Sequence, residues 1–323
     1  MKHNNDIPMS DAGQQAYSQC SVSGSASVDL FGNPIIKNEL LKDRFGEVPF
    51  TILDSRSGNW KKRKQKWLKL NIKSEVGRKD FNNNTKANNF ANMNNEKYDI
   101  GGYHKLNSES GYASIFNPAL AELLYNWFLN EGDEILDPFC GGSVRGIVAN
   151  YLGYKYTGID IRQEQVDSNR EQCLQILPVN NQPQYYVGDS VTVLDEFTKQ
   201  YDCVFTCPPY VGLEVYSDLQ GDISNMDYDS FIINYKAIIQ KAVNKLKVGG
   251  WFIIVVGEVR GKDGYYLNFC GKTKDIIIEA GCKLYNEMIY ITPIGAKAMT
   301  ANRLMKNKKI GKIHEFVYVF RKV

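Results

Sequence analysis

The chain has 323 residues, of which 43% are hydrophobic and 23% charged, so it can bury a sizeable core and is not disordered as a whole. It has no run of about 18 apolar residues and no apolar segment behind a positive start, so we expect neither a membrane span nor a secretory signal, and a soluble, cytoplasmic protein. Seven cysteines without a C-x-x-C pair, beside only three histidines, predict reduced thiols and no metal site.

The net charge of +3 is unevenly distributed. Residues 61–79 carry nine Lys or Arg against one Glu, and residues 297–313 carry six against none, which leaves −11 for the rest of the chain (3 − 8 − 6). Clustered positive charge is typical of a surface that contacts phosphates, although a solvated helix face or loop carries the same pattern. The candidate nucleic-acid-binding residues are Lys61, Lys62, Arg63, Lys64, Arg303, Lys306, Lys308, Lys309 and Lys312.

Two N-terminal regions precede the main domain. Residues 1–40 are polar without apolar periodicity and predict a mobile arm. Residues 41–105 predict a small basic extension, in which Trp60 and Trp67 share one helical face and are expected to pack in a core while neighbouring lysines face phosphates. Eight Asn between positions 82 and 95 predict a flexible loop within this extension.

Residues 106–323 predict an α/β catalytic domain. Asn117 caps a helix that begins at Pro118, and after it short apolar strands alternate with helical stretches. This alternation predicts a Rossmann-like, mostly parallel sheet with helices on both faces and ligands at the carboxyl ends of its strands. Seven strands are expected, at 134–137, 156–161, 185–189, 202–207, 251–256, 283–291 and 315–320, with helices at 144–152, 162–176, 190–198, 227–246 and 272–280.

Acidic residues end three successive predicted strands. The first ends at Asp137 and runs into a glycine-rich turn that begins a helix; the next two end at Asp160 and Asp189. Glycines allow close approach of the backbone to a ligand, and a carboxylate can accept hydrogen bonds from ribose hydroxyls or an adenine amine. The pattern predicts a nucleoside cofactor. A dinucleotide is disfavoured because G-x-G-x-x-G is absent.

The fourth predicted strand ends in Cys207-Pro208-Pro209-Tyr210. Consecutive prolines fix an extended turn and leave carbonyl groups unpaired, which suits an exocyclic amine with two N–H donors, and Tyr210 offers a ring on which a flipped base can stack. The alternative is a turn that only ends a strand. Gly257–Arg260, after the fifth strand, either line the base pocket or cap the sheet with an ion pair.

DPFCGGS, GIDI and CPPY resemble the motifs of S-adenosylmethionine-dependent DNA amino-methyltransferases, the N4-cytosine and N6-adenine group. The segment that begins FGEVPFTILDS also resembles the leading part of phage and prophage methylases, which implies a modification role. The resemblance implies S-adenosylmethionine as cofactor, DNA as partner, and Cys207, Pro208, Pro209 and Tyr210 as catalytic residues. It implies cofactor contacts from Ser114, Phe116, Asn117, Asp137, Pro138, Phe139, Gly141, Gly142, Ser143, Asp160, Ile161, Asp189 and Ser190.

Two positions depart from the motifs. Ser143 stands where a third glycine is usual, and Cys207 stands where Asp, Asn or Ser is usual, although a thiol is a poor acceptor. Because Cys is closest in size to Ser, and S-P-P-Y is typical of the N4-cytosine enzymes, cytosine is slightly favoured. Three alternatives stay open: an RNA base methyltransferase, a pyrimidine C5 methyltransferase with Cys207 as nucleophile, and an inactive nucleic-acid-binding protein with this fold.

Overall fold

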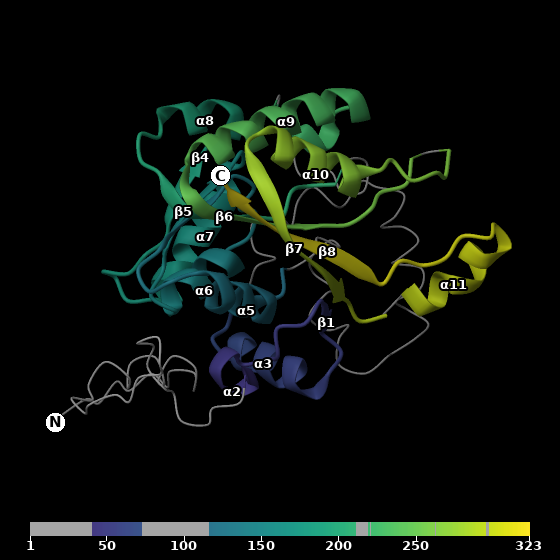
Figure 1. Ribbon diagram of the computed structural model, residues 1–323. Helices are drawn as coiled ribbons and strands as arrows, with labels where there is room; N and C mark the ends of the chain where they lie inside the picture. The colour runs from purple at the N-terminus through teal and green to yellow at the C-terminus, as the bar shows by residue number, and fades with distance from the viewer. Residues whose placement is uncertain (1–40, 73–115, 211–218, 220, 262, 295–296) are drawn as a thin grey trace, which may run out of the picture.

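The computed structural model describes residues 41–72, 116–210, 219, 221–261, 263–294 and 297–323. The predicted N-terminal arm, the Asn-rich loop and Ser114 lie outside them. The strands are β1 (Ile52–Asp54), β2 (Glu134–Asp137), β3 (Lys155–Asp160), β4 (Gln184–Val187), β5 (Tyr201–Thr206), β6 (Leu246–Val256), β7 (Cys282–Ile291) and β8 (His314–Lys322). They form one sheet in the order β1-β7-β8-β6-β5-β2-β3-β4, parallel throughout except for β8 (Figure 1).

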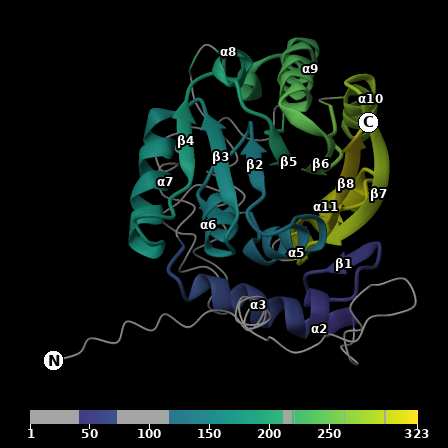
Figure 2. The same cartoon turned by 60° about the vertical axis from the view of Figure 1, so that its left-hand side comes forward.

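Helices lie on both faces of this sheet (Figure 2). They are α2 (Leu41–Phe45), α3 (Gly58–Leu68), α5 (Pro118–Phe128), α6 (Val144–Tyr151), α7 (Gln163–Ile176), α8 (Ser190–Glu196), α9 (Tyr228–Asn244), α10 (Phe269–Glu279) and α11 (Lys297–Lys306), with a 3-10 turn η3 (Ile223–Asn225). One core lies between the sheet and α3, α5, α6 and α7, and a second lies between the sheet and α8, α9 and α10. The predicted α/β fold class is confirmed.

The sheet has one strand more than the seven predicted. Residues 52–54 form β1, which pairs in parallel with β7 at the edge of the sheet, and the amide of Ser55 donates to the carbonyl oxygen of Ile291 at 3.2 Å. Three residues are too few for an alternation of apolar and polar side chains to be recognised in the sequence. The strand is defined only by its pairing with β7. The N-terminal segment thus contributes to the same sheet as the rest, while the predicted domain boundary near residue 105 stays a prediction.

Two tryptophans attach α3 to the body of the molecule. Trp60 and Trp67 are each 4% exposed, which confirms the prediction that they are core residues. The Trp60 ring centroid lies 5.8 Å from that of Tyr290, and Trp67 donates its indole N–H to Glu122 at 2.6 Å. Burial of such large rings contributes strongly to stability, so α3 is part of the structural core rather than an appendage.

The second basic stretch is partly helical. Sequence patterning predicts a basic loop at residues 297–313, whereas the structure has α11 between β7 and β8, projecting from the sheet (Figure 1). None of the described helices combines the length and apolar character that a membrane span needs. Within the described residues, no three His, Cys, Asp or Glu side chains are grouped to hold a metal ion.

Candidate active site

The two motif loops meet at the point where the strand order of the sheet reverses. β2 lies between β3 and β5, so β3 and β4 extend the sheet on one side of β2, and β5 and β6 extend it on the other side. Ligands bind at the carboxyl ends of strands at such a point. The glycine-rich loop follows β2 and CPPY follows β5, and the Thr206 hydroxyl, one residue before CPPY, donates to Asp137 Oδ1 at 2.7 Å. A direct hydrogen bond therefore joins the bases of the two loops.

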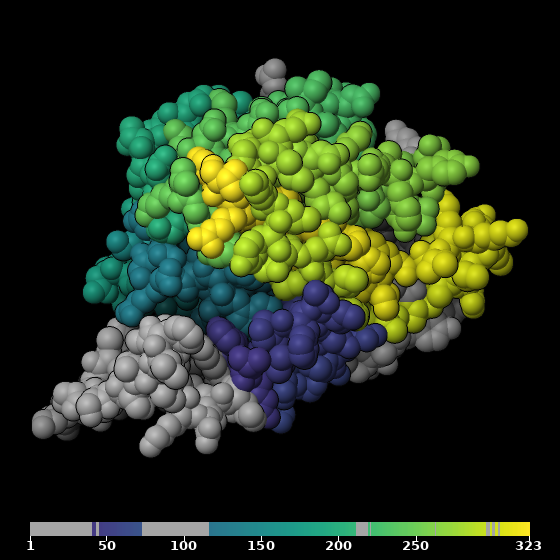
Figure 3. Space-filling view, in the orientation of Figure 1, coloured from purple at the N-terminus to yellow at the C-terminus, as the bar shows by residue number. Residues whose placement is uncertain are grey.

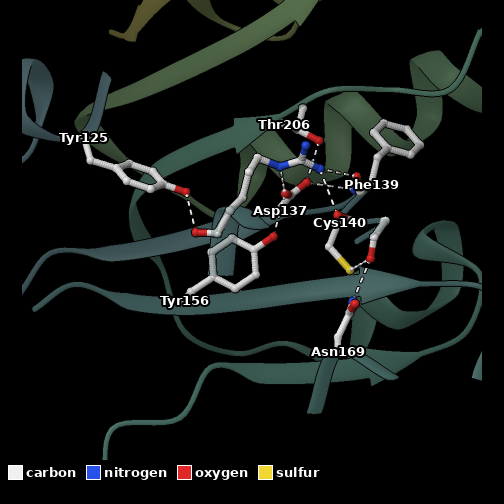
Figure 4. A network of polar contacts seen from close by, with 9 residues as sticks. Tyr125, Asp137, Phe139, Cys140, Tyr156, Asn169 and Thr206 are labelled. Atoms are coloured by element: carbon white, nitrogen blue, oxygen red, sulfur yellow. Dashed lines mark hydrogen bonds and ion pairs between the residues drawn. The ribbon is translucent and has the colours of Figure 1, made fainter. Parts of the chain in front are cut away.

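Asp137 is the centre of a buried polar network (Figure 4). Its fully buried carboxylate also accepts hydrogen bonds from Arg145 Nε at 2.6 Å, the Tyr156 hydroxyl at 2.7 Å and the Phe139 amide at 3.1 Å. Four donors satisfy most of the acceptor capacity of a carboxylate. The Asp137 side chain therefore shapes the loop, and a direct contact of Asp137 with the cofactor stays a prediction.

Arg145 is the partner that sequence reasoning missed. Its guanidinium also donates to the carbonyl oxygens of Phe139 at 2.7 Å and Cys140 at 3.0 Å, and it lies 4.8 Å from the ring centroid of Phe116. Burial alone lowers the pKa of Arg145, but the charge of Asp137 more than offsets this and raises it above its usual value. The available signal was a single charged residue in the otherwise apolar start of a helix, VRGIVA.

The inner side of the glycine-rich loop packs against β3 and α7. A Cβ atom on Gly158 would lie 2.7 Å from the Cβ of Cys140, so only glycine fits in β3 there. Asn169 donates its side-chain amide to the Gly141 carbonyl at 2.7 Å, and Gly141 has a φ of 50°, which favours glycine. β3 and α7 thereby hold the glycine-rich loop in place on one side, and Gly141 and Gly142 remain half-buried.

Three further predicted cofactor residues have side chains that bind within the chain. The Ser143 hydroxyl donates to Gln172 at 2.8 Å, and the Ser190 hydroxyl donates to the Pro138 carbonyl at 2.6 Å. Asn117 caps α5 through the Ala119 amide and donates to the Tyr290 hydroxyl at 2.6 Å. These side chains thus take part in hydrogen bonds within the chain, and the cofactor contacts of these residues stay predictions. Pro138 is buried as well.

The remaining predicted residues lie half-buried at the strand ends. Asp160 ends β3 and accepts from the Arg162 amide at 2.9 Å, and Asp189 caps α8 through the Val191 amide at 2.8 Å. A Cβ on Gly221 would lie 3.2 Å from Ile161 and 3.4 Å from Asp189, so the segment before η3 covers this edge. Two carboxylates, which accept hydrogen bonds, lie beside an apolar Ile161 and the half-buried Phe139, and this combination fits the hydroxyl and amine donors of a nucleoside.

CPPY lies on the other side of the network. Pro208 is buried, and no described residue donates a hydrogen bond to its carbonyl oxygen. The half-buried Tyr210 donates its hydroxyl to Glu315 at 3.3 Å, and its ring meets Phe269 edge-on at 6.2 Å. Burial and the charge of Glu315 raise the pKa of Tyr210 well above its usual value, so the phenol stays protonated. Cys207 is half-buried and close enough to Arg145 to affect its pKa.

In the Gly257–Arg260 segment Gly257 lies beside Tyr210, and the role of this segment in lining the base pocket stays a prediction. The Glu258 carboxylate accepts from the backbone amides of Phe269 at 2.8 Å and Cys270 at 3.4 Å, and so caps the N-terminus of α10. Asn268, the residue before α10, makes no such cap. Lys312 donates to the Glu258 carbonyl at 2.7 Å, which places a residue of the basic stretch beside Tyr210.

The predicted nucleic-acid-binding residues separate into two groups. Arg63 is ion-paired with Glu122 at 2.6 Å and donates to the Gly46 carbonyl, so we correct its assignment to phosphate contact. Lys64 is half-buried, and burial lowers its pKa. The other group consists of exposed or half-buried lysines, namely Lys61, Lys62, Lys306, Lys308, Lys309 and Lys312. The Arg303 side chain lies outside the described residues.

Comparison with known proteins supports the resemblance. Residues 37–171 match the family model of N6/N4 methyltransferases, described as DNA methylase. This match confirms the resemblance to amino-methyltransferases, and with it S-adenosylmethionine as the cofactor that the resemblance implies. The match begins well before the glycine-rich loop and includes β1 and α3. Among curated proteins, none matches the chain.

Several solved structures are similar in fold. TrmN from Thermus thermophilus is 17% identical with a TM-score of 0.43; the match covers 64% of this chain and 49% of that one, so this chain matches only about half of its length. A TehB-like SAM-dependent methyltransferase from Corynebacterium glutamicum is 15% identical, with a TM-score of 0.40 and coverage of 73% and 96%. Magnesium protoporphyrin IX methyltransferase (ChlM) from Synechocystis PCC 6803, with bound SAM, is 14% identical, with a TM-score of 0.44 and coverage of 76% and 95%.

Proposed function

We propose that this methyltransferase acts on DNA and transfers the methyl group directly to the exocyclic amine of a base that is flipped out of the duplex. Cytosine N4 is slightly favoured over adenine N6, because Cys207 resembles the Ser of the N4-cytosine motif in size. The observation that carries the proposal is the hydrogen bond between Thr206 and Asp137, which holds the cofactor loop and CPPY side by side. A modification role of phage type stays a prediction from the N-terminal segment.

The residues of the chain have separate tasks in this reaction. Asp160 and Asp189 would accept hydrogen bonds from the ribose and adenine of S-adenosylmethionine, and the loop from Phe139 to Gly142 would border its methionine part. When bound, the cofactor supplies an electrophilic methyl group. The Pro208 carbonyl would accept one N–H of the target amine and orient its lone pair, while Tyr210 would stack on the base. As the new N–C bond forms, the S–C bond breaks and the amine proton passes to water.

Identification of the methylated nucleoside tests the proposal. DNA from cells that express the chain is digested to nucleosides and examined by mass spectrometry, and purified protein is assayed for tritium transfer to duplex DNA, single-stranded DNA and total RNA. We expect N4-methylcytosine or N6-methyladenine, with DNA as the preferred acceptor. Transfer to RNA alone would show that the second reading, an RNA base methyltransferase, is correct, and cofactor binding without transfer to any acceptor would indicate an inactive fold.

One observation favours a different chemistry, C5 methylation of a pyrimidine. The charge of Cys207 contributes to raising the pKa of the buried Arg145, and nucleophilic cysteines are found where a cation stabilises the thiolate. In that reaction Cys207 would bond to C6 of the base, and a DNA substrate with 5-fluorocytosine would trap an adduct that survives denaturation. We expect no adduct and an active Cys207→Ser variant, since a hydroxyl accepts a hydrogen bond better than a thiol. A Cys207-dependent adduct would overturn the amino-methylation reading.

A further inference from the structure

A tight hairpin follows β6 at the same edge of the sheet as CPPY. Arg260 and Tyr266 form an antiparallel bridge, and the Gly261 amide donates to the Tyr265 carbonyl at 2.8 Å. The turn closes through the Gly264 amide, which donates to Gly261, and Gly264 has a φ of 89°. Such a turn requires glycine, so the hairpin has a defined shape rather than that of a loose loop.

The hairpin presents two large rings to solvent. Tyr265 is 76% exposed and has no ring contact with another described residue, whereas Tyr266 is 48% exposed and lies under the Arg260 guanidinium, 3.8 Å from its ring centroid. Arg260 also donates to the Gly264 carbonyl at 2.9 Å. Arg260 therefore fixes Tyr266 and the turn, and the Tyr265 ring is left available for a flat, stacking ligand.

Lysines that follow α11 lie against this hairpin. A Cβ on Gly264 would lie 2.7 Å from Lys309 Nζ, and Lys312 reaches the Glu258 carbonyl just before the hairpin. In Figures 1 and 3 the segment that contains the hairpin and the segment of α11 project from the same side of the molecule. Exposed aromatic rings and positive charge are thus brought together beside the candidate base site.

The turn after α11 has an unusual residue. The amides of Lys309 and Lys308 donate to the carbonyls of Leu304 and Met305, both at 2.9 Å, which is the pattern that ends a helix with a left-handed residue. Lys308 takes the left-handed position with a φ of 52°, where glycine is usual. Lysines at a helix C-terminus also interact favourably with its dipole, so stability must be measured alongside any binding role. Residues 306–313 carry four Lys and no acidic residue.

We propose that residues 260, 261 and 263–266 of the hairpin and the lysines of 306–312, together called the tyrosine–lysine clamp, hold duplex DNA next to the base that is methylated. Lys308 and Lys309 contact phosphates, and the Tyr265 ring stacks on the base of the opposite strand that loses its partner when the target base flips. The occupant is DNA rather than an acidic protein because the clamp combines a row of cations with an exposed ring. The inference rests on the proposed action on DNA and adds the surface that positions it.

Binding of a short fluorescein-labelled DNA duplex of mixed sequence, followed by anisotropy, tests the clamp. We expect Tyr265→Ala to weaken binding about 5- to 100-fold, from the loss of one stacked base, and Tyr265→Phe to stay within about threefold of the unchanged chain. The double variant Lys308→Gln with Lys309→Gln should reduce the salt slope by about 1.8, since each phosphate contact contributes about 0.9. The matched controls are Tyr285→Ala, 60% exposed on β7, and Lys155→Gln with Lys283→Gln, on distant exposed positions.

Cofactor affinity by calorimetry should not change in any variant. The free energy of unfolding is measured for each variant, so that DNA binding is compared between folded proteins. Wild-type duplex affinity for Tyr265→Ala, or a wild-type salt slope for the lysine variant, would overturn the clamp. Equal losses in the control variants would overturn it too. If the unchanged chain methylates DNA and the clamp variants bind the duplex with the same affinity and salt slope as the unchanged chain, only the clamp is wrong. If the unchanged chain binds and methylates only RNA, the proposed function and the DNA occupant are both wrong.

Discussion

The two halves of the candidate site differ in how they use their polar side chains. At the ends of β2, β3 and β4, which we call the cofactor edge, the central ion pair of Asp137 and Arg145 is buried and surrounded by internal hydrogen bonds. At the ends of β5 and β6 and the start of β8, the target edge, Tyr210 and Glu315 are only half-buried. Each turnover uses a chemically identical cofactor, which suits a preformed loop, whereas the proposed function requires the target edge to accept DNA of different sequence.

The largest effect is expected at the buried ion pair. Arg145→Ala leaves the Asp137 carboxylate buried without its counter-charge, which should lower the free energy of unfolding by about 3–5 kcal/mol in chemical denaturation. The matched control is Lys236→Ala, which removes the exposed pair with Glu279 and should cost less than about 1 kcal/mol. Equal losses in the two variants would show that the cofactor edge is not more rigidly built than the surface.

The second prediction concerns the carboxylate that remains at the cofactor edge. Asp160→Ala should weaken the binding of S-adenosylmethionine by about 1–3 kcal/mol, because the ribose hydroxyls lose their acceptor, and titration calorimetry measures this directly. Asp167→Ala, an exposed carboxylate on α7, serves as control and should bind the cofactor normally. Unchanged affinity in Asp160→Ala would remove this residue from the site.

The target edge should respond through the nucleic acid rather than the cofactor. Tyr210→Ala should lose one stacking interaction, about 1–3 kcal/mol in kcat/KM for DNA, with cofactor affinity unchanged. Tyr210→Phe keeps the ring and loses only the hydrogen bond to Glu315, about 0.5–1.5 kcal/mol. If Tyr210→Phe is as poor as Tyr210→Ala, the hydroxyl rather than the ring is what matters.

The smallest effect is expected on α3. Lys61→Gln with Lys62→Gln should reduce the salt slope of duplex binding by about 1.8 if both lysines contact phosphates, with the same loss on every DNA sequence. Arg63 is left in place, since its pair with Glu122 is structural. An unchanged salt slope would mean that Lys61 and Lys62 form a solvated helix face and that other cationic residues make the phosphate contacts.

The sequence predicts the regular elements well and the internal partners poorly. β2 has its predicted bounds, since a short apolar run that ends in an acidic residue and a glycine turn is a strong local signal. Asn117 was correctly placed as a helix cap, but its bond to Tyr290, 173 residues away, leaves no trace in the local pattern. Similarly, the pattern marks Asp137 as important without showing that Arg145, Tyr156 and Thr206 enclose it.

The pairing of β1 with β7 has a consequence for how the chain is made. Ser55 and Ile291 are 236 residues apart, so at about 5–20 residues per second roughly 10 to 50 seconds of translation separate the two strands. Trp67 finds Glu122 and Tyr151 much earlier, while Trp60 must wait for Tyr290. The N-terminal segment is therefore among the first parts to be synthesised and among the last to be completed, and during that interval the Trp60 side of α3 lacks the residues against which it packs.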